Sequence, residues 1–129
     1  RIGGDTASFL SNDAAHQRSW RQQIKDGTRI QVRVRDMDSL LAESGVECID
    51  IAVLDVEGAE SDVLDGFDLA RWGVRCLVIE DLSRGRNRVL RVSLGEQGYD
   101  HAMRIGLNDV FVKRGDAIAQ RAHVLCGQP

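Results

Sequence analysis

Two mainly apolar runs that each stop at acidic residues constrain the fold of this chain more than any other feature. The first, residues 49–54, stops at Asp55, and the second, residues 74–79, stops at Glu80 and Asp81. Runs of this kind, bounded by polar residues, are typical of strands that are buried on both faces of a parallel sheet. The chain is therefore predicted to build its core around these two strands.

Helical patterns follow both runs, which gives the alternation of an α/β fold. Apolar residues recur at helical spacing in residues 59–65 and again in residues 86–97. The second of these helices is expected to bury Val89, Leu90 and Leu94. The basic residues at and near its start, Arg84, Arg86, Arg88 and Arg91, are interpreted as a solvated helix face.

The remaining segments complete a sheet that is parallel except for an edge strand. Residues 28–35 alternate between apolar and polar side chains, as a half-exposed strand does. Residues 36–43 predict a short helix capped by Asp38. Two more strands, 99–105 and 110–113, flank a turn and form a hairpin. The predicted class is α/β, with parallel strands and an antiparallel edge hairpin.

Composition fits one domain and excludes several functional classes. The 129 residues are 43% hydrophobic and 29% charged, with a net charge of −3 spread along the chain, so no nucleic-acid footprint is present. No apolar stretch approaches the ~20 residues of a membrane span. The three cysteines form no CxxC pair, which favours a cytoplasmic setting.

We divide the chain into three parts. The N-terminal segment (1–27) is poorly defined, with a possible helix over 13–26. The domain covers residues 28–114, and a C-terminal tail (115–129) holds a short helical pattern.

The acidic residues at the strand ends are the candidate site. In an open parallel sheet, ligands bind outside the carboxyl ends of the strands, where Asp55, Glu57, Glu80 and Asp81 are expected to converge. Glu60 falls in the first turn of the following helix, where a structural role is favoured.

Two further polar residues are weaker candidates. His101 is the one histidine near a predicted strand, and a structural role is favoured over that of a base. Asn108 lies in the predicted turn, where tolerance of a left-handed conformation explains it at least as well as a role in the site.

Several motifs together resemble FkbM-type methyltransferases. Residues 51–60 read Ile-Ala-Val-Leu-Asp-Val-Glu-Gly-Ala-Glu, similar to that family's Lys-Ile-Asp-Val-Glu-Gly-Ala-Glu signature. Residues 34–41 resemble its Val-x-Thr-Leu-Asp-Ser-Leu-Leu segment, residues 77–80 its second strand ending in Glu, and residues 98–99 and 106–112 its closing elements. The resemblance covers residues 28–114 in the same order.

The resemblance implies a Rossmann-like class I domain that transfers a methyl group from S-adenosylmethionine to a sugar or polyketide-like hydroxyl. It assigns catalytic roles to Asp55, Glu57 and Glu80, and Asp55 is also a candidate for contact with the methyl donor. Because related metal-dependent enzymes hold Mg²⁺ at these strand ends, Asp55, Glu80 and Asp81 are candidate metal ligands.

Departures from the family pattern leave alternatives open. Val53 and Leu54 stand where the family has Lys-Ile, and the glycine-rich loop that holds the donor is absent from the sequence. The chain is therefore expected to be the C-terminal part of the domain and inactive alone. The alternative is a non-catalytic Rossmann-like scaffold that acts through a partner chain. A third hypothesis is an enzyme that carries out Mg²⁺-assisted phosphate chemistry, but such an enzyme would need a phosphate-binding loop, which is not found in the sequence. Half a sheet would expose a strand edge, so we expect a homo-oligomer or docking to the rest of the protein.

Overall fold

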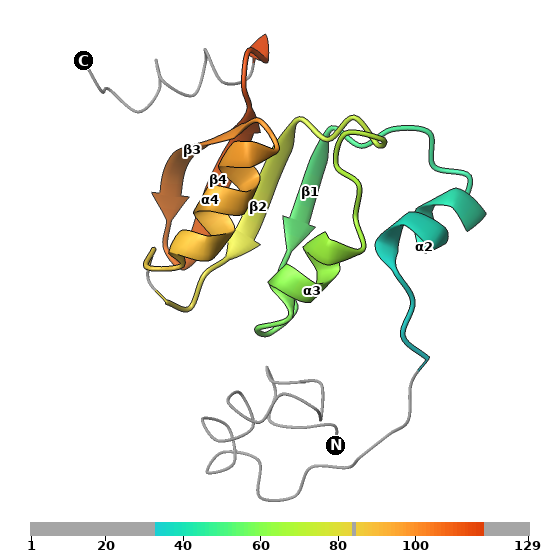
Figure 1. The fold of residues 1–129 in the computed structure, drawn as a ribbon, viewed down its shortest axis with the longest axis horizontal. Helices are drawn as coiled ribbons and strands as arrows, with labels where there is room; N and C mark the ends of the chain where they lie inside the picture. Colours follow the sequence, from blue (N-terminus) through green and yellow to red (C-terminus); the bar gives the residue numbers. More distant parts are fainter. Residues whose placement is uncertain (1–32, 84, 118–129) are drawn as a thin grey trace, which may run out of the picture.

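The computed structural model describes residues 33–83 and 85–117. These ranges form a mixed α/β domain with a four-stranded sheet (Figure 1). Its elements, in chain order, are α2 (Met37–Glu43), β1 (Ile51–Leu54), α3 (Glu60–Asp65), β2 (Cys76–Glu80), α4 (Arg88–Glu96), β3 (Tyr99–Ile105) and β4 (Asn108–Lys113).

The strand order is β1-β2-β4-β3, which confirms the parallel pair and the hairpin but places one strand differently from the prediction. β1 and β2 are parallel, whereas β4 is antiparallel to both of its neighbours. The antiparallel strand therefore lies inside the sheet, and β3 forms the edge. The hairpin turn is also tighter than predicted, because Asn108 and Asp109 belong to β4 and only Gly106 and Leu107 lie between the strands.

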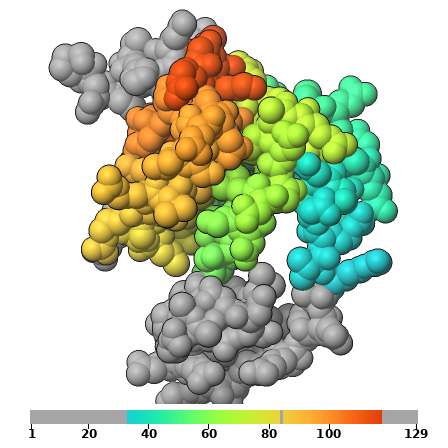
Figure 2. Space-filling model, in the orientation of Figure 1, coloured from blue at the N-terminus to red at the C-terminus, as the bar shows by residue number. Residues whose placement is uncertain are grey.

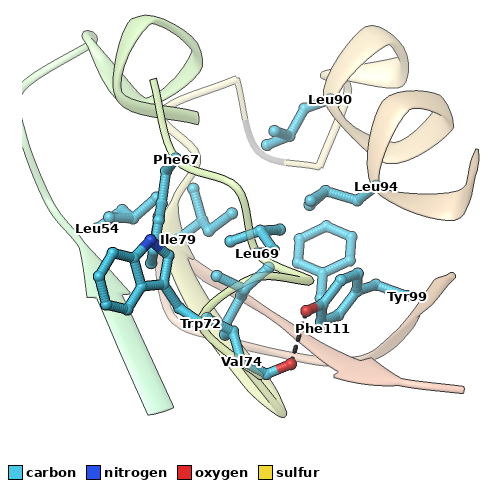
Figure 3. Close-up of a cluster of buried hydrophobic side chains, with 11 residues drawn as sticks. Leu54, Phe67, Leu69, Trp72, Val74, Ile79, Leu90, Leu94, Tyr99 and Phe111 are labelled. Atoms are coloured by element: carbon cyan, nitrogen blue, oxygen red, sulfur yellow. Dashed lines mark hydrogen bonds between the residues drawn. The ribbon is translucent and has the colours of Figure 1, made fainter. Parts of the chain in front are cut away.

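Both α3 and α4 lie on one face of the sheet, in front of the strands in Figure 1. In the space-filling view, their side chains largely hide the strands from this side (Figure 2). Leu90 and Leu94 of α4 reach the core, as predicted, whereas Val89 is 81% exposed, which corrects the prediction that it faces inward. The core beneath the helices is drawn in Figure 3 and consists of Leu54, Phe67, Leu69, Trp72, Val74, Leu77, Ile79, Leu90, Leu94, Tyr99 and Phe111.

Only β2 meets the prediction of a central, largely buried strand. Leu77 and Ile79 of β2 are fully buried under the helices, and Leu54 of β1 lies beside them. Ile51 and Val53 of β1 are 58% and 66% exposed, so β1 is buried on one face rather than on both. The exposed side chains alternate with Ala52 and Leu54, so Ile51 and Val53 lie on the face of β1 opposite the core.

Two local predictions near the start of the described region are wrong. Residues 33–36 do not form a strand, and the rest of the predicted strand lies outside the described residues. The helix predicted over 13–26 also lies outside them. Of the short helix predicted in the tail, only the first residue is described. The cap of α2 is Asp36, whose carboxylate accepts from the Ser39 amide at 2.7 Å. Asp38 instead accepts from Trp72 Nε1 at 2.7 Å and fastens α2 to the core.

No helix of the described residues is long and apolar enough to span a membrane.

Candidate functional site

The carboxyl ends of β1 and β2 lie side by side and carry the predicted acids. Leu54 is the register partner of Ile79, so Asp55 and Glu80 follow at the same level of the sheet. Burial raises the pKa of Glu80, and the negative charges of Asp55, Glu57 and Glu60 raise it further. The structure therefore brings Asp55, Glu57 and Glu80 into one electrostatic group.

The loop after β1 has a specific shape that Glu60 maintains. Glu57 adopts a left-handed conformation with φ 55°, and Gly58 follows with φ 96°. Such a conformation is uncommon for a residue other than glycine. Glu60 Oε1 accepts from the amides on both sides of Glu57, at 3.2 Å from Val56 N and 3.1 Å from Gly58 N. Glu60 thus has a structural role, as expected, but it serves the loop before its helix.

Glu80 holds the most unusual atom of this group. Its Oε2 is buried and has no hydrogen-bond partner within the described residues. Its register partner on β4 is Asn108, which lies in a strand and not in a left-handed turn. The explanation of Asn108 as a turn residue is therefore wrong. An unpaired buried carboxylate oxygen is costly, and a catalytic role is one explanation for such an atom in a native protein.

Asp81 does not join the acids at the strand ends. Although the residue is buried, which would raise its pKa, hydrogen bonds from Ser83, Gly85 and Arg104 outweigh burial and hold the pKa below its usual value. Its carboxylate accepts from Ser83 N at 2.9 Å and Gly85 N at 2.7 Å, and Arg104 Nη1 lies 3.4 Å away. These contacts occupy both carboxylate oxygens.

The metal prediction is not supported. Within residues 33–83 and 85–117, no three His, Cys, Asp or Glu side chains gather in a way that could hold a metal ion. Asp81 is the ligand that the predicted set loses, because successive side chains along a strand point to opposite faces. Asp55, Glu57 and Glu80 remain close enough to interact electrostatically, but they do not form a group that could hold a metal ion.

A second ionic cluster, which the sequence did not predict, lies around Asp109 of β4. Asp109 is 1% exposed, and its carboxylate contacts Arg104 Nη1 at 3.1 Å, His101 Nε2 at 3.1 Å and Arg91 Nη2 at 3.2 Å. His101 also packs edge-on against Phe111. Arg91 therefore belongs to a partly buried ion pair, which corrects its assignment to a solvated face.

The sequence held one signal for this cluster. Asp109 and Phe111 are two residues apart in β4 and so share a face, and a phenylalanine in a strand favours a buried face. A strand that begins at Asn108 places Asp109 on the same buried face, where an acid needs cationic partners.

Comparison with known families gives the decisive observation. Residues 2–101 match the model of the methyltransferase FkbM domain. The chain belongs to the FkbM methyltransferase family. In this FkbM domain, the Asp-Val-Glu-Gly-Ala-Glu motif is the loop after β1, and the family match continues through α4 and ends in β3. No curated protein and no solved structure matches the chain significantly.

Proposed function

We propose that this FkbM domain transfers a methyl group from S-adenosylmethionine to a hydroxyl oxygen of a sugar or natural product, with Asp55, Glu57 and Glu80 at its reactive edge. Family membership supports methyl transfer in general. The observation that supports this site is the buried, unpartnered Oε2 of Glu80 beside two further carboxylates. The β1–β2 pair and the strand-end loops are consistent with a Rossmann-like class I sheet.

The charge of the site fits the donor in part. When bound, S-adenosylmethionine supplies an electrophilic methyl group on a positively charged sulfur. Asp55, exposed and directly after β1, and Glu57 would provide negative charge toward that cation and toward the donor's amino group. The sequence contains no glycine-rich loop for the rest of the donor.

Glu80 is suited to accept the proton of the acceptor hydroxyl. A general base works best when its pKa is near the working pH, and burial together with neighbouring acids raises the pKa of Glu80 in that direction. Its Oε2 has no hydrogen bond within the described residues, so no donor there competes with an acceptor hydroxyl that reaches it. The loop held by Glu60 and the strand end would keep the carboxylates in place while the hydroxyl is aligned.

A methyl-transfer assay on the intact protein tests this proposal. Labelled S-adenosylmethionine would be offered with a panel of glycosides and polyketide alcohols, and transfer to oxygen is expected. Asp55→Asn and Glu80→Gln should each lower turnover at least about tenfold with folding intact. Asp62→Asn, an exposed acid on α3, is the matched control and should leave turnover unchanged. Full activity of Glu80→Gln would remove Glu80 from the reaction.

Titration with S-adenosylhomocysteine separates the enzyme from a non-catalytic scaffold. The intact protein should bind this product, whereas the 129-residue chain should bind it weakly or not at all, because it lacks a glycine-rich loop. An intact protein that neither binds the product nor transfers methyl groups would favour the scaffold.

A further inference from the structure

Arg104 makes more polar contacts than its place in a surface hairpin would suggest. All three of its guanidinium nitrogens are used: Nε donates to Gly106 O at 3.1 Å, and Nη1 contacts the carboxylates of Asp81 and Asp109. Nη2 donates to the main-chain oxygens of Asp81 at 2.8 Å and Leu107 at 3.4 Å. A guanidinium is suited to such multiple bonding because its donors lie in a rigid plane.

These contacts join the tip of the β3–β4 hairpin to the turn that follows Glu80. The Asp81 amide donates to Leu107 O at 2.8 Å, so the main chain of Asp81 is bonded to the hairpin through both its N–H and its C=O. On the other side, Arg104 is anchored by the buried Asp109, which pairs across the sheet with Ile79 of the core. The turn is thus tied to a rigid part of the fold.

The same contacts divide the acids between two surroundings. The charges of Asp55, Glu57 and Glu60 raise the pKa of Glu80, beyond the effect of its burial. The Asp81 carboxylate instead lies among donors and accepts from Ser83 N, Gly85 N and Arg104 Nη1. Arg104 neutralises the Asp81 carboxylate and holds it beside Asp109, whose side chain lies on the helix-covered face with Ile79.

We propose that Arg104 is a positioning residue for Glu80: it fixes the turn after β2 against the hairpin and pairs with the Asp81 carboxylate, which the alternation of the strand directs away from the reactive edge. This inference rests on the proposed function of Glu80. The inference adds that the β3–β4 hairpin determines the position of the reactive edge, although the hairpin contributes no acid to that edge.

The test compares Arg104→Gln and Arg104→Lys with Arg114→Gln in the intact protein. Arg114 pairs with Asp100 at the opposite end of the hairpin and is 59% exposed, so it is the matched control. Carboxyl ¹³C NMR follows the titration of Glu80, and steady-state kinetics give kcat and the KM for S-adenosylmethionine.

Arg104→Gln should move the Glu80 titration upward by roughly half a pH unit or more, because the Asp81 charge loses its partner. It should lower kcat by about fivefold or more and change the KM by less than about twofold. Arg104→Lys, which keeps the charge but not the planar fork, should fall between the wild type and Arg104→Gln. Arg114→Gln should change neither readout.

A folded Arg104→Gln protein with the Glu80 titration and kcat of the wild type would overturn the proposal. Should that variant not fold, Arg104→Lys decides: wild-type behaviour in both readouts overturns the proposal, and an intermediate shift supports it. The double variant Arg104→Gln/Asp81→Asn removes both charges, so full recovery of kcat would show a purely electrostatic effect and contradict positioning. Because the NMR titration needs no acceptor, it tests Arg104 even if methyl transfer itself is disproved.

Discussion

Glu80 and Asp81 are consecutive in the chain, yet their carboxylates lie in opposite electrostatic surroundings. Glu80 is half-buried among Asp55, Glu57 and Glu60, and its pKa is raised. Asp81 is buried among hydrogen-bond donors that include Arg104, and its pKa is lowered. The two residues should therefore respond to substitution and to pH in opposite ways.

Glu80→Gln should stabilise the folded protein at pH 7. Because the pKa of Glu80 is raised on folding, its favourable contribution is complete below the ordinary value of 4.5 and is lost as the pH rises through the raised value. A neutral glutamine avoids that loss, so the variant should have a larger free energy of unfolding than the wild type at pH 7. This gain should shrink toward zero at pH 4. Urea denaturation at both pH values measures it. Glu96→Gln, at an exposed position of α4, should show no such gain; an equal gain there would refute the explanation.

Asp81→Asn should destabilise the protein at pH 7 by about 2 kcal/mol, because the charged hydrogen bonds to the turn and to Arg104 are lost. The pKa of Asp81 is lowered, so its contribution is present above the ordinary value of 3.8 and disappears as the pH falls. The difference in the free energy of unfolding between the variant and the wild type should accordingly become smaller as the pH is lowered. Chemical denaturation tests this, with exposed Asp65→Asn as the control. A variant as stable as the wild type would show that Asp81 does not secure the turn.

Glu60→Ala should loosen the loop after β1. The change removes the acceptor for Val56 N and Gly58 N and should cost about 1 kcal/mol, whereas Glu60→Gln keeps a side-chain oxygen and should cost less. Amide hydrogen exchange at Val56 and Gly58 should accelerate in the alanine variant. Protection equal to the wild type at both amides would mean that Glu60 does not hold the loop.

Gly66→Ala should destabilise the protein by about 1–3 kcal/mol through overpacking. A Cβ at this position would lie 3.0 Å from Asp36 Cβ and 3.3 Å from Asp36 Cα, next to the cap of α2. Gly95→Ala is the matched control, since a Cβ there meets nothing within 4 Å and the position is helical. That variant should gain up to about 1 kcal/mol. Thermal or urea unfolding of the two variants should move in opposite directions; movement in the same direction would contradict the steric explanation.

The sequence by itself predicted the helices and strands of the described region, apart from the strand expected over residues 28–35, and it predicted acidic residues at the ends of β1 and β2. Apolar runs that end in acids predicted β1 and β2, because a buried strand must be apolar and its end can be polar. The motif from Asp55 to Glu60 also predicted the family, which the family match confirms.

Only the tertiary structure decided which neighbours each of these residues has. The insertion of β4 between β2 and β3 pairs residues distant in the chain, and no local pattern encodes that choice. It places Asn108 opposite Glu80 and brings Arg104 to Asp81. Residues next to each other in sequence, such as Glu80 and Asp81, are separated by the alternation of the strand, whereas residues as far apart as Asp81 and Arg104 are joined by the pairing of the sheet. Local sequence specifies elements through short-range sterics and periodicity, but ion pairs and burial depend on contacts that exist only after the sheet has assembled.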